Sequence, residues 1–154
     1  MNKLFDIRRT MLFRSLALAG VGALSARHVA AAQPEVVDKT EHYRVVFQVS
    51  DADTKKWHLL LNNVKNVQQD FGKKNVTIEV VAFGPGINML TAESELANPV
   101  LEAMTQGVLV VACENTMRAL HLKHSDMVSG ISFVPAGVAE LIKRQAAGYA
   151  YIRS

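Results

Sequence analysis

Apolar residues in this chain occur in short runs that alternate with longer segments of helical periodicity. Apolar-rich runs of about four to eight residues are typical of strands, whereas helices usually need about ten or more. The predicted strands lie at residues 43–49, 76–83, 108–113, 130–134 and 148–152. The predicted helices lie at residues 54–71, 95–106, 115–120 and 138–147. This alternation predicts a three-layer α/β/α domain with a mainly parallel, five-stranded sheet and right-handed crossovers.

The third predicted strand ends at Cys113, the only cysteine in the chain. Ligands of open α/β sheets bind at the carboxyl ends of strands, so a thiol there is well placed for chemistry. The polar residues that follow predict a helix start, whose free N–H groups and dipole lower a cysteine pKa. Glu114 opposes this effect, and Arg118, about one turn further on, could reinforce it. A buried and inert Cys113 is the alternative, because free cysteine is among the most buried residue types.

The inventory of reactive residues limits the chemistry that Cys113 could perform. A single cysteine excludes both an internal disulfide and a Cys-x-x-Cys oxidoreductase acting alone. No His and Asp can be assigned to it as members of a hydrolytic triad. His121 and His124 have a three-residue spacing, but no other ligand pair accompanies them, so we predict no metal site. We also expect no cofactor.

The loop after the second predicted strand contains two glycines that flank a proline. Gly84 and Gly86 permit close backbone approach or positive φ, so we include them among the candidate binding residues. The loop lacks the spacing and the Lys-Ser/Thr ending of a phosphate loop, and a tight strand-to-helix turn is the favoured interpretation. The apolar residues at 87–90 are predicted to face a pocket or a partner, or equally to cap the core.

The net charge of +3 suggests a nucleic-acid partner until its distribution is considered. Five of the 17 Lys and Arg residues precede Gln33, and the remainder of the chain has 12 basic against 13 acidic residues. The excess positive charge therefore belongs to the N-terminal segment and not to a binding surface. Because no basic stripe with interleaved aromatic residues is present, we exclude nucleic-acid binding.

The N-terminal segment has the pattern of an export signal. Arg8 and Arg9 precede an apolar run at residues 16–24 and small residues that end at Ala32. The paired arginines favour a twin-arginine signal over an ordinary secretory signal at residues 1–32. The apolar run is shorter than the roughly 20 residues of a transmembrane helix, although an uncleaved anchor is an alternative.

Cleavage of this signal defines the expected organisation and location of the protein. Cleavage after Ala32 leaves a flexible tail at residues 33–42 and a domain at residues 43–154, and cleavage after Ala26 is the alternative. We expect a periplasmic protein with no membrane association after cleavage.

Several separated motifs resemble the DsrE/DsrF-like family. They are LLNNVKN at residues 60–66, CENTM at 113–117, VPAGVAEL at 134–141 and QAAGYAYI at 145–152. The resemblance spans residues 43–152 and implies a three-layer α/β/α fold and homo-oligomers. It also implies a cysteine that carries sulfur as a persulfide, here Cys113, with a protein as sulfur donor or acceptor. We expect Asn115 and Thr116, or backbone N–H groups, to bind the carried sulfur.

Two other functions are compatible with the sequence. The first is a non-catalytic module that binds a small ligand or a protein above the strand ends, with Cys113 lining the pocket. The second is an oligomeric scaffold in which the apolar segment at 87–90 lies between subunits.

Overall fold

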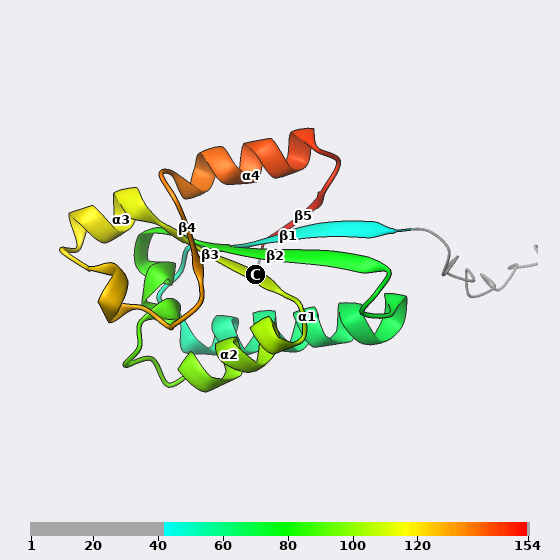
Figure 1. Ribbon diagram of the computed structural model, residues 1–154, viewed down its shortest axis with the longest axis horizontal. Coiled ribbons are helices and arrows are strands. Elements are labelled where there is room, and N and C mark those ends of the chain that lie inside the picture. The colour runs from blue at the N-terminus through cyan, green and yellow to red at the C-terminus, as the bar shows by residue number, and fades with distance from the viewer. Residues whose placement is uncertain (1–41, 154) are drawn as a thin grey trace, which may run out of the picture. The chain divides into compact units, whose positions relative to one another are not determined.

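The computed structural model of the protein describes residues 42–153, which form one α/β domain (Figure 1). The predicted signal peptide and the predicted tail up to residue 41 lie outside the described residues. The elements in chain order are β1 (Tyr43–Val49), α1 (Thr54–Phe71), β2 (Val76–Ala82), η1 (Gly84–Leu90), α2 (Ala97–Thr105), β3 (Leu109–Cys113), α3 (Glu114–Ala119), η2 (His124–Asp126), β4 (Ser132–Val134), α4 (Gly137–Ala146) and β5 (Ala150–Arg153).

The five strands form one sheet in which every pair is parallel. Their order is β4-β3-β2-β1-β5, so the last strand lies at one edge. The predicted fold class is therefore confirmed. In the register of the β3–β4 pair, Cys113 lies opposite Val134, the last residue of β4. This pairing places the turn after β4 next to the thiol.

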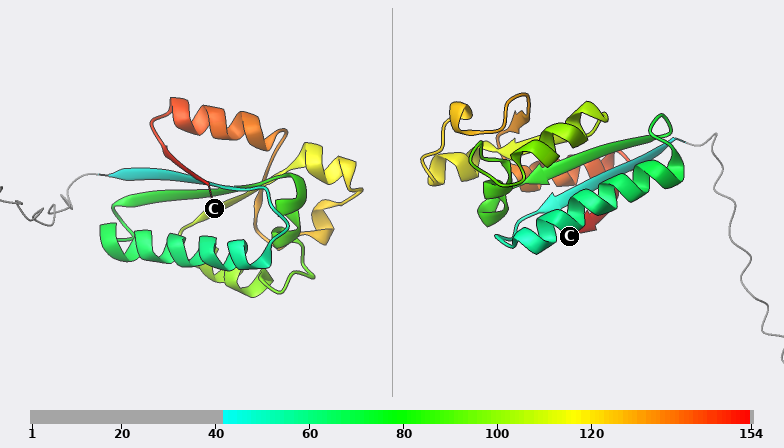
Figure 2. Two further views of the ribbon diagram at one scale, coloured as in Figure 1. Left: turned by 180° about the vertical axis from the view of Figure 1, so that it is seen from behind. Right: turned by 90° about the horizontal axis from the view of Figure 1, so that it is seen from below.

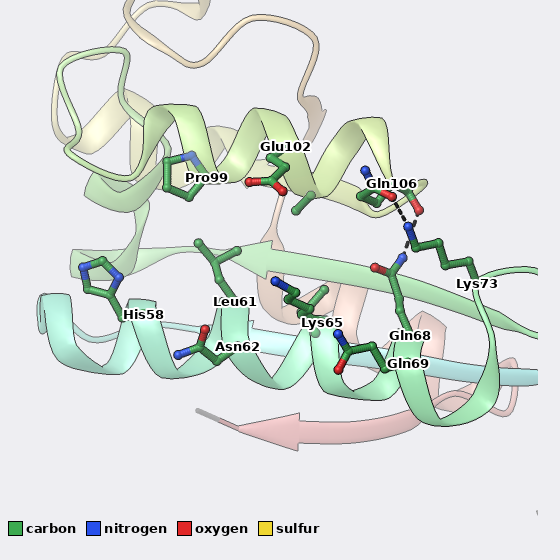
Figure 3. A pocket seen from close by; sticks show the side chains of 12 residues that line it. His58, Leu61, Asn62, Lys65, Gln68, Gln69, Lys73, Pro99, Glu102 and Gln106 are labelled. Atoms are coloured by element: carbon green, nitrogen blue, oxygen red, sulfur yellow. Dashed lines mark hydrogen bonds between the residues drawn. The ribbon is translucent and has the colours of Figure 1, made fainter.

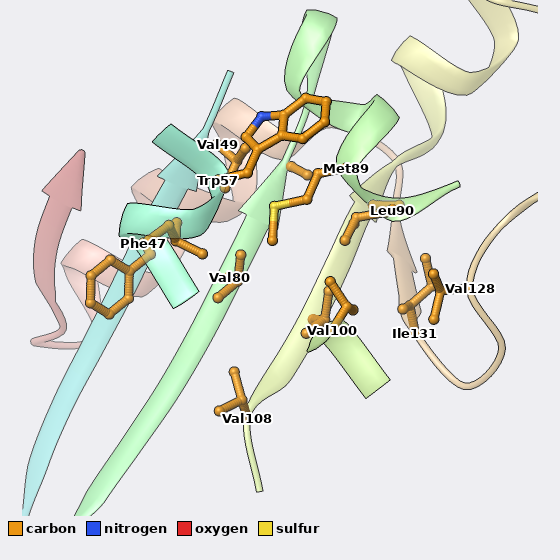
Figure 4. Packing of buried hydrophobic residues seen from close by; sticks show 14 of the residues in the cluster. Phe47, Val49, Trp57, Val80, Met89, Leu90, Val100, Val108, Val128 and Ile131 are labelled. Carbon is orange, nitrogen blue, oxygen red and sulfur yellow. The ribbon is translucent and has the colours of Figure 1, made fainter. Parts of the chain in front are cut away.

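The main hydrophobic core lies between the sheet and the layer formed by α1 and α2 (Figures 1 and 4). One face of α1 contributes Trp57, Leu60 and Val64, in agreement with its predicted apolar periodicity. The segment at residues 87–90 also packs here, because Ile87, Met89 and Leu90 are at most 1% exposed. The core-capping interpretation of that segment is confirmed, and its assignment to a subunit interface is wrong.

The opposite face of the sheet is covered mainly by α4 (Figure 2). Its buried apolar cluster is small and contains Val46, Val81 and Val111 from the sheet and Leu141 from α4. The two faces of the sheet are therefore unequally packed.

Local sequence signals account for most element boundaries. The side chain of Asp53 accepts a hydrogen bond from Lys55 N at 2.9 Å and caps α1, and Gly72 ends this helix with φ of 87°. Pro99 lies inside the first turn of α2, which begins at Ala97, two residues after the predicted start at residue 95. Proline is tolerated there because the first N–H groups of a helix have no intrahelical acceptor. Among the residues that the structure describes, no helix combines the length and apolar character needed to cross a membrane.

Candidate functional site

Cys113 is the last residue of β3 and the N-cap of α3, as the sequence predicts. Its side chain lies on the face of the sheet that α4 covers, and the residue is only 5% exposed. The structure therefore combines the two features that the sequence left as alternatives, namely a position for chemistry and burial.

The amide groups of two helix starts surround the Cys113 sulfur. Hydrogen bonding comes mainly from the backbone of Gly137 in α4 and of Thr116 in α3, and least from the backbone of Asn115, whose N–H also donates to Pro135 O at 3.1 Å. Burial alone raises the pKa of the Cys113 thiol, but these hydrogen bonds outweigh it and lower the pKa below its ordinary value of 9.0. The surroundings thus favour the thiolate, which is the nucleophilic form of cysteine.

The Thr116 hydroxyl connects the thiol to the glycine loop after β2. Gly84 N donates a hydrogen bond to Thr116 Oγ1 at 2.9 Å, and the Thr116 side chain in turn lowers the pKa of Cys113. Because the oxygen accepts from Gly84, its own proton is available to the sulfur. The candidate residues Gly84 and Thr116 are therefore brought together with Cys113.

Gly137 is a residue of this site that the sequence interpretation did not include. A Cβ atom at this position would lie 3.0 Å from Phe83 Cδ1 and 3.3 Å from Cys113 Cβ. Glycine therefore lets the start of α4 approach the thiol closely. The available signal was the Pro135-Ala136-Gly137 turn after a strand, but its proximity to Cys113 depends on the strand order.

Of the remaining candidate residues, Asn115 and Arg118 are exposed on α3, whereas Gly86 is buried. The Asn115 side chain accepts a hydrogen bond from the exposed Arg118 guanidinium, which is accordingly tied to the outer surface of α3. Gly84, Asn115 and Thr116 also line an open hollow beside α3. Gly86 is buried, and a Cβ atom there would lie 2.5 Å from the carbonyl oxygen of Val49. Close packing against β1 explains the glycine at that position.

The two histidines that follow α3 do not form a metal centre with other side chains. His124 Nε2 lies 3.4 Å from Glu114 Oε1, and its ring stacks on Phe133 at 3.7 Å between centroids. His121 lies in a turn with φ of 55°. Within residues 42–153, no three His, Cys, Asp or Glu side chains lie close enough together to bind a metal ion.

The fold and this site define a class of protein: a parallel three-layer α/β domain with one thiol at the carboxyl end of an inner strand. The chain belongs to the DsrE/DsrF-like family, whose model matches residues 43–153.

Solved structures support the same assignment. A protein of unknown function from Methanobacterium thermoautotrophicum, MTH1491, is 41% identical, with a TM-score of 0.70 over 73% of this chain and 99% of its own. BT1422 from Bacteroides thetaiotaomicron, a conserved protein of unknown function, is 13% identical, with a TM-score of 0.61 over 72% of this chain and 94% of its own. The ychN protein from E. coli is 9% identical, with a TM-score of 0.59 over 74% and 99% of the two chains. The last two show similarity of fold alone, and a comparison with curated proteins found no match.

Proposed function

We propose that this protein carries sulfane sulfur as a persulfide on Cys113. The observation that carries the proposal is the convergence of amide groups from the starts of α3 and α4 on a single thiol with a lowered pKa. The same groups can stabilise the terminal sulfur of a persulfide, which is also anionic. Membership of the DsrE/DsrF-like family supports this function.

The proposed loading step is a sulfur transfer without net oxidation. The Cys113 thiolate attacks the outer sulfur of a donor persulfide, R–S–SH. A bond forms between Cys113 Sγ and that sulfur, the donor S–S bond breaks, and the donor leaves as the thiolate R–S⁻. Its electron pair comes from the broken bond, and the proton of the transferred S–H group remains on the new persulfide or passes to solvent. Transfer to an acceptor thiolate is the reverse reaction with a new partner.

The setting of this reaction is part of the proposal. We place the protein in the bacterial periplasm after export by the twin-arginine signal at residues 1–32, as a homo-oligomer that exchanges sulfur with a donor or acceptor protein. The paired Arg8 and Arg9 support the export route, and the exposed apolar side chains of α4 and β5 support the oligomer.

Intact-mass spectrometry after incubation with glutathione persulfide tests the carrier function. The wild-type chain should gain one sulfur atom, and cyanide should release that sulfur as thiocyanate. Cys113→Ser should gain none. A wild-type chain that gains no sulfur, or a Cys113→Ser chain that gains the same amount, would overturn the proposal.

The burial of Cys113 supports a second candidate, a non-catalytic binding module of the same fold. In such a module the thiol, which is 5% exposed, has no chemical role and only packs the starts of α3 and α4 together. In that case Cys113→Ser would retain full biological activity, and the folded wild-type chain would resist alkylation.

A further inference from the structure

A groove between α1 and α2 lies on the face of the sheet opposite to Cys113 (Figure 3). Its volume of ≈ 390 Å³ is in the range of small-molecule sites, which begins at about 300 Å³. The floor is apolar, and the rim has amide and charged side chains. The apolar lining comes from Leu61, Val64, Pro99 and Ala103, and the polar lining from His58, Asn62, Lys65, Gln68, Gln69, Lys73, Glu102 and Gln106.

Gln68 provides a fixed acceptor inside this groove. The residue is 8% exposed, and its Nε2 donates a hydrogen bond to Gln106 O at 2.9 Å. This bond fixes which way the amide points, and in Figure 3 its oxygen is directed into the groove. Oε1 has no hydrogen-bond donor among the residues that the structure describes. This oxygen is accessible from the groove, where it can accept a hydrogen bond from a ligand with an N–H or O–H group.

Two opposite charges face the groove from its two walls without meeting. Lys65 lies on α1 and Glu102 on α2, and across residues 42–153 neither side chain forms an ion pair or a hydrogen bond. A ligand with one anionic and one cationic end could pair with both walls at once. The apolar floor between them, which includes Leu61 and Ala103, would contact a hydrocarbon side chain.

We infer that this groove binds a zwitterionic α-amino acid with an aliphatic side chain. Lys65 pairs with its carboxylate, Glu102 and Gln68 Oε1 accept from its ammonium group, and the aliphatic side chain lies on the apolar floor. Leu61, Val64 and Lys65 belong to the 60–66 segment, for which the proposed thiol chemistry has no use. The inference does not depend on the proposed function, because the groove and the thiol lie on opposite faces of the sheet.

Isothermal titration of the full chain with L-leucine and two of its analogues tests this inference. Isocaproate keeps the side chain and the carboxylate but lacks the amine, and isoamylamine keeps the side chain and the amine but lacks the carboxylate. We expect L-leucine to bind with a Kd on the order of 1 mM or lower, and each analogue to bind at least about tenfold more weakly. No binding of L-leucine at about 10 mM, or equal binding of all three probes, would overturn the inference.

The same titration can compare charge-removing variants inside the groove with matched control variants outside it. Lys65→Met and Glu102→Gln should each weaken L-leucine binding about tenfold, whereas Lys55→Met and Glu93→Gln, which change exposed charges outside the groove, should not. Circular dichroism would verify that all four variants are folded. Equal affinity in the groove variants and the controls would contradict the assignment. Cys113→Ser should bind L-leucine normally, which separates this result from the outcome of the sulfur-transfer experiment.

Discussion

The Thr116 hydroxyl stabilises the Cys113 thiolate, so Thr116→Val should raise the pKa of the thiol. A hydrogen bond to a charged group is worth about 1.5–3 kcal/mol, and one pKa unit corresponds to about 1.4 kcal/mol. We therefore expect a rise of about one unit, measured as the midpoint of the alkylation rate against pH. In the wild-type chain this midpoint should lie below 9.0. Thr105→Val is the control, because the Thr105 hydroxyl donates only to Glu102 O within α2.

The lowered pKa also predicts a pH dependence of stability. Because the folded state holds the Cys113 pKa below 9.0, deprotonation of the thiol favours the folded state. The stabilisation should be fully present above pH 9.0 and should be lost as the pH falls through the folded-state pKa. Urea unfolding of the wild type and Cys113→Ser at several pH values measures it. A stability difference between the two that does not change with pH would contradict the lowered pKa.

Two buried glycines permit close contacts near the site, and their substitution should have graded effects. Gly137→Ala would bring a methyl group within 3.0 Å of Phe83 Cδ1, a side-chain atom, and should destabilise the fold by about 1–3 kcal/mol. Gly86→Ala would place one 2.5 Å from Val49 O, a backbone atom that can yield less, so its effect should be larger. Urea unfolding at neutral pH measures both, and the reverse order would contradict the packing described here.

Sequence reasoning at the residue scale found the thiol but not all of its surroundings. The apolar run that ends at Cys113 and the polar residues after it revealed a strand end and a helix start. Thr116 follows from helix geometry, because the N–H groups of a first turn point toward the N-cap. Gly137 is 24 residues further along the chain, and only the parallel pairing of β3 with β4 brings it to the sulfur. No local pattern contains that pairing.

At the scale of elements, α4 is attached to the sheet by a buried charged cluster as well as by Leu141. Arg144 Nε lies 2.5 Å from Glu79 Oε2 on β2 and 2.9 Å from Glu140 Oε1 on α4 itself. Burial raises the pKa of Glu79, and the nearby Glu140 adds to the rise, while Arg144 opposes it. Removal of Arg144 would therefore leave the buried Glu79 carboxylate without a cation, and Glu140 with only the exposed Lys143.

Arg144→Met should destabilise the domain and weaken the packing of α4 over Cys113. Loss of one partner of a buried pair costs about 3–5 kcal/mol, and the Arg144 side chain is 31% exposed, so we expect about 2–3 kcal/mol. Cys113 should be alkylated faster, because α4 supplies Gly137 to the site. Lys143→Met, which alters a 70% exposed side chain 3.7 Å from Glu140, should change little.

The pH dependence of Arg144→Met gives a further test of the cluster. Without the cation, the raised pKa of Glu79 should rise further, and protonation of this carboxyl favours the folded state. The destabilisation should be largest above the folded-state pKa and should shrink as the pH falls toward 4.5. If Arg144→Met lost as much stability at pH 4.5 as at about pH 8, this role of Glu79 would be contradicted.

Most elements could be predicted from the sequence because their periodicity and caps are local. The apolar residues of η1 show the limit: Ile87, Met89 and Leu90 follow a glycine loop, and no periodicity indicates whether the core or a partner covers them. Their burial depends on α2 and β3, both of which come later in the chain and pack against η1. Tertiary packing, and not the local sequence pattern, decides whether such a segment is buried in the core.

At the scale of the whole molecule, alternating strands and helices predict a parallel sheet but not the order of its strands. The crossover rule limits the topologies, and the order β4-β3-β2-β1-β5 is one of several that it permits. In this order the chain leaves β4 at one edge of the sheet, crosses the sheet through α4, and forms β5 at the free edge of β1. That edge position leaves Tyr151 and Ile152 at 40% and 36% exposed.

We predict that copies of the chain associate through the exposed apolar side chains of α4 and β5. Of the eight large apolar side chains exposed among the described residues, four lie on these two neighbouring elements: Val138, Ile142, Tyr151 and Ile152. A free edge strand that carries one charged residue, Arg153, is a template for pairing with a second copy.

Ile142→Lys and Ile152→Lys should therefore shift the molar mass from light scattering toward the monomer and weaken association at least about tenfold. Leu59→Lys, at a similarly exposed position on α1, should leave the molar mass unchanged. A wild-type chain that is monomeric at micromolar concentration would contradict the association, and a loss of association in Leu59→Lys alone would place the interface on the other face of the sheet.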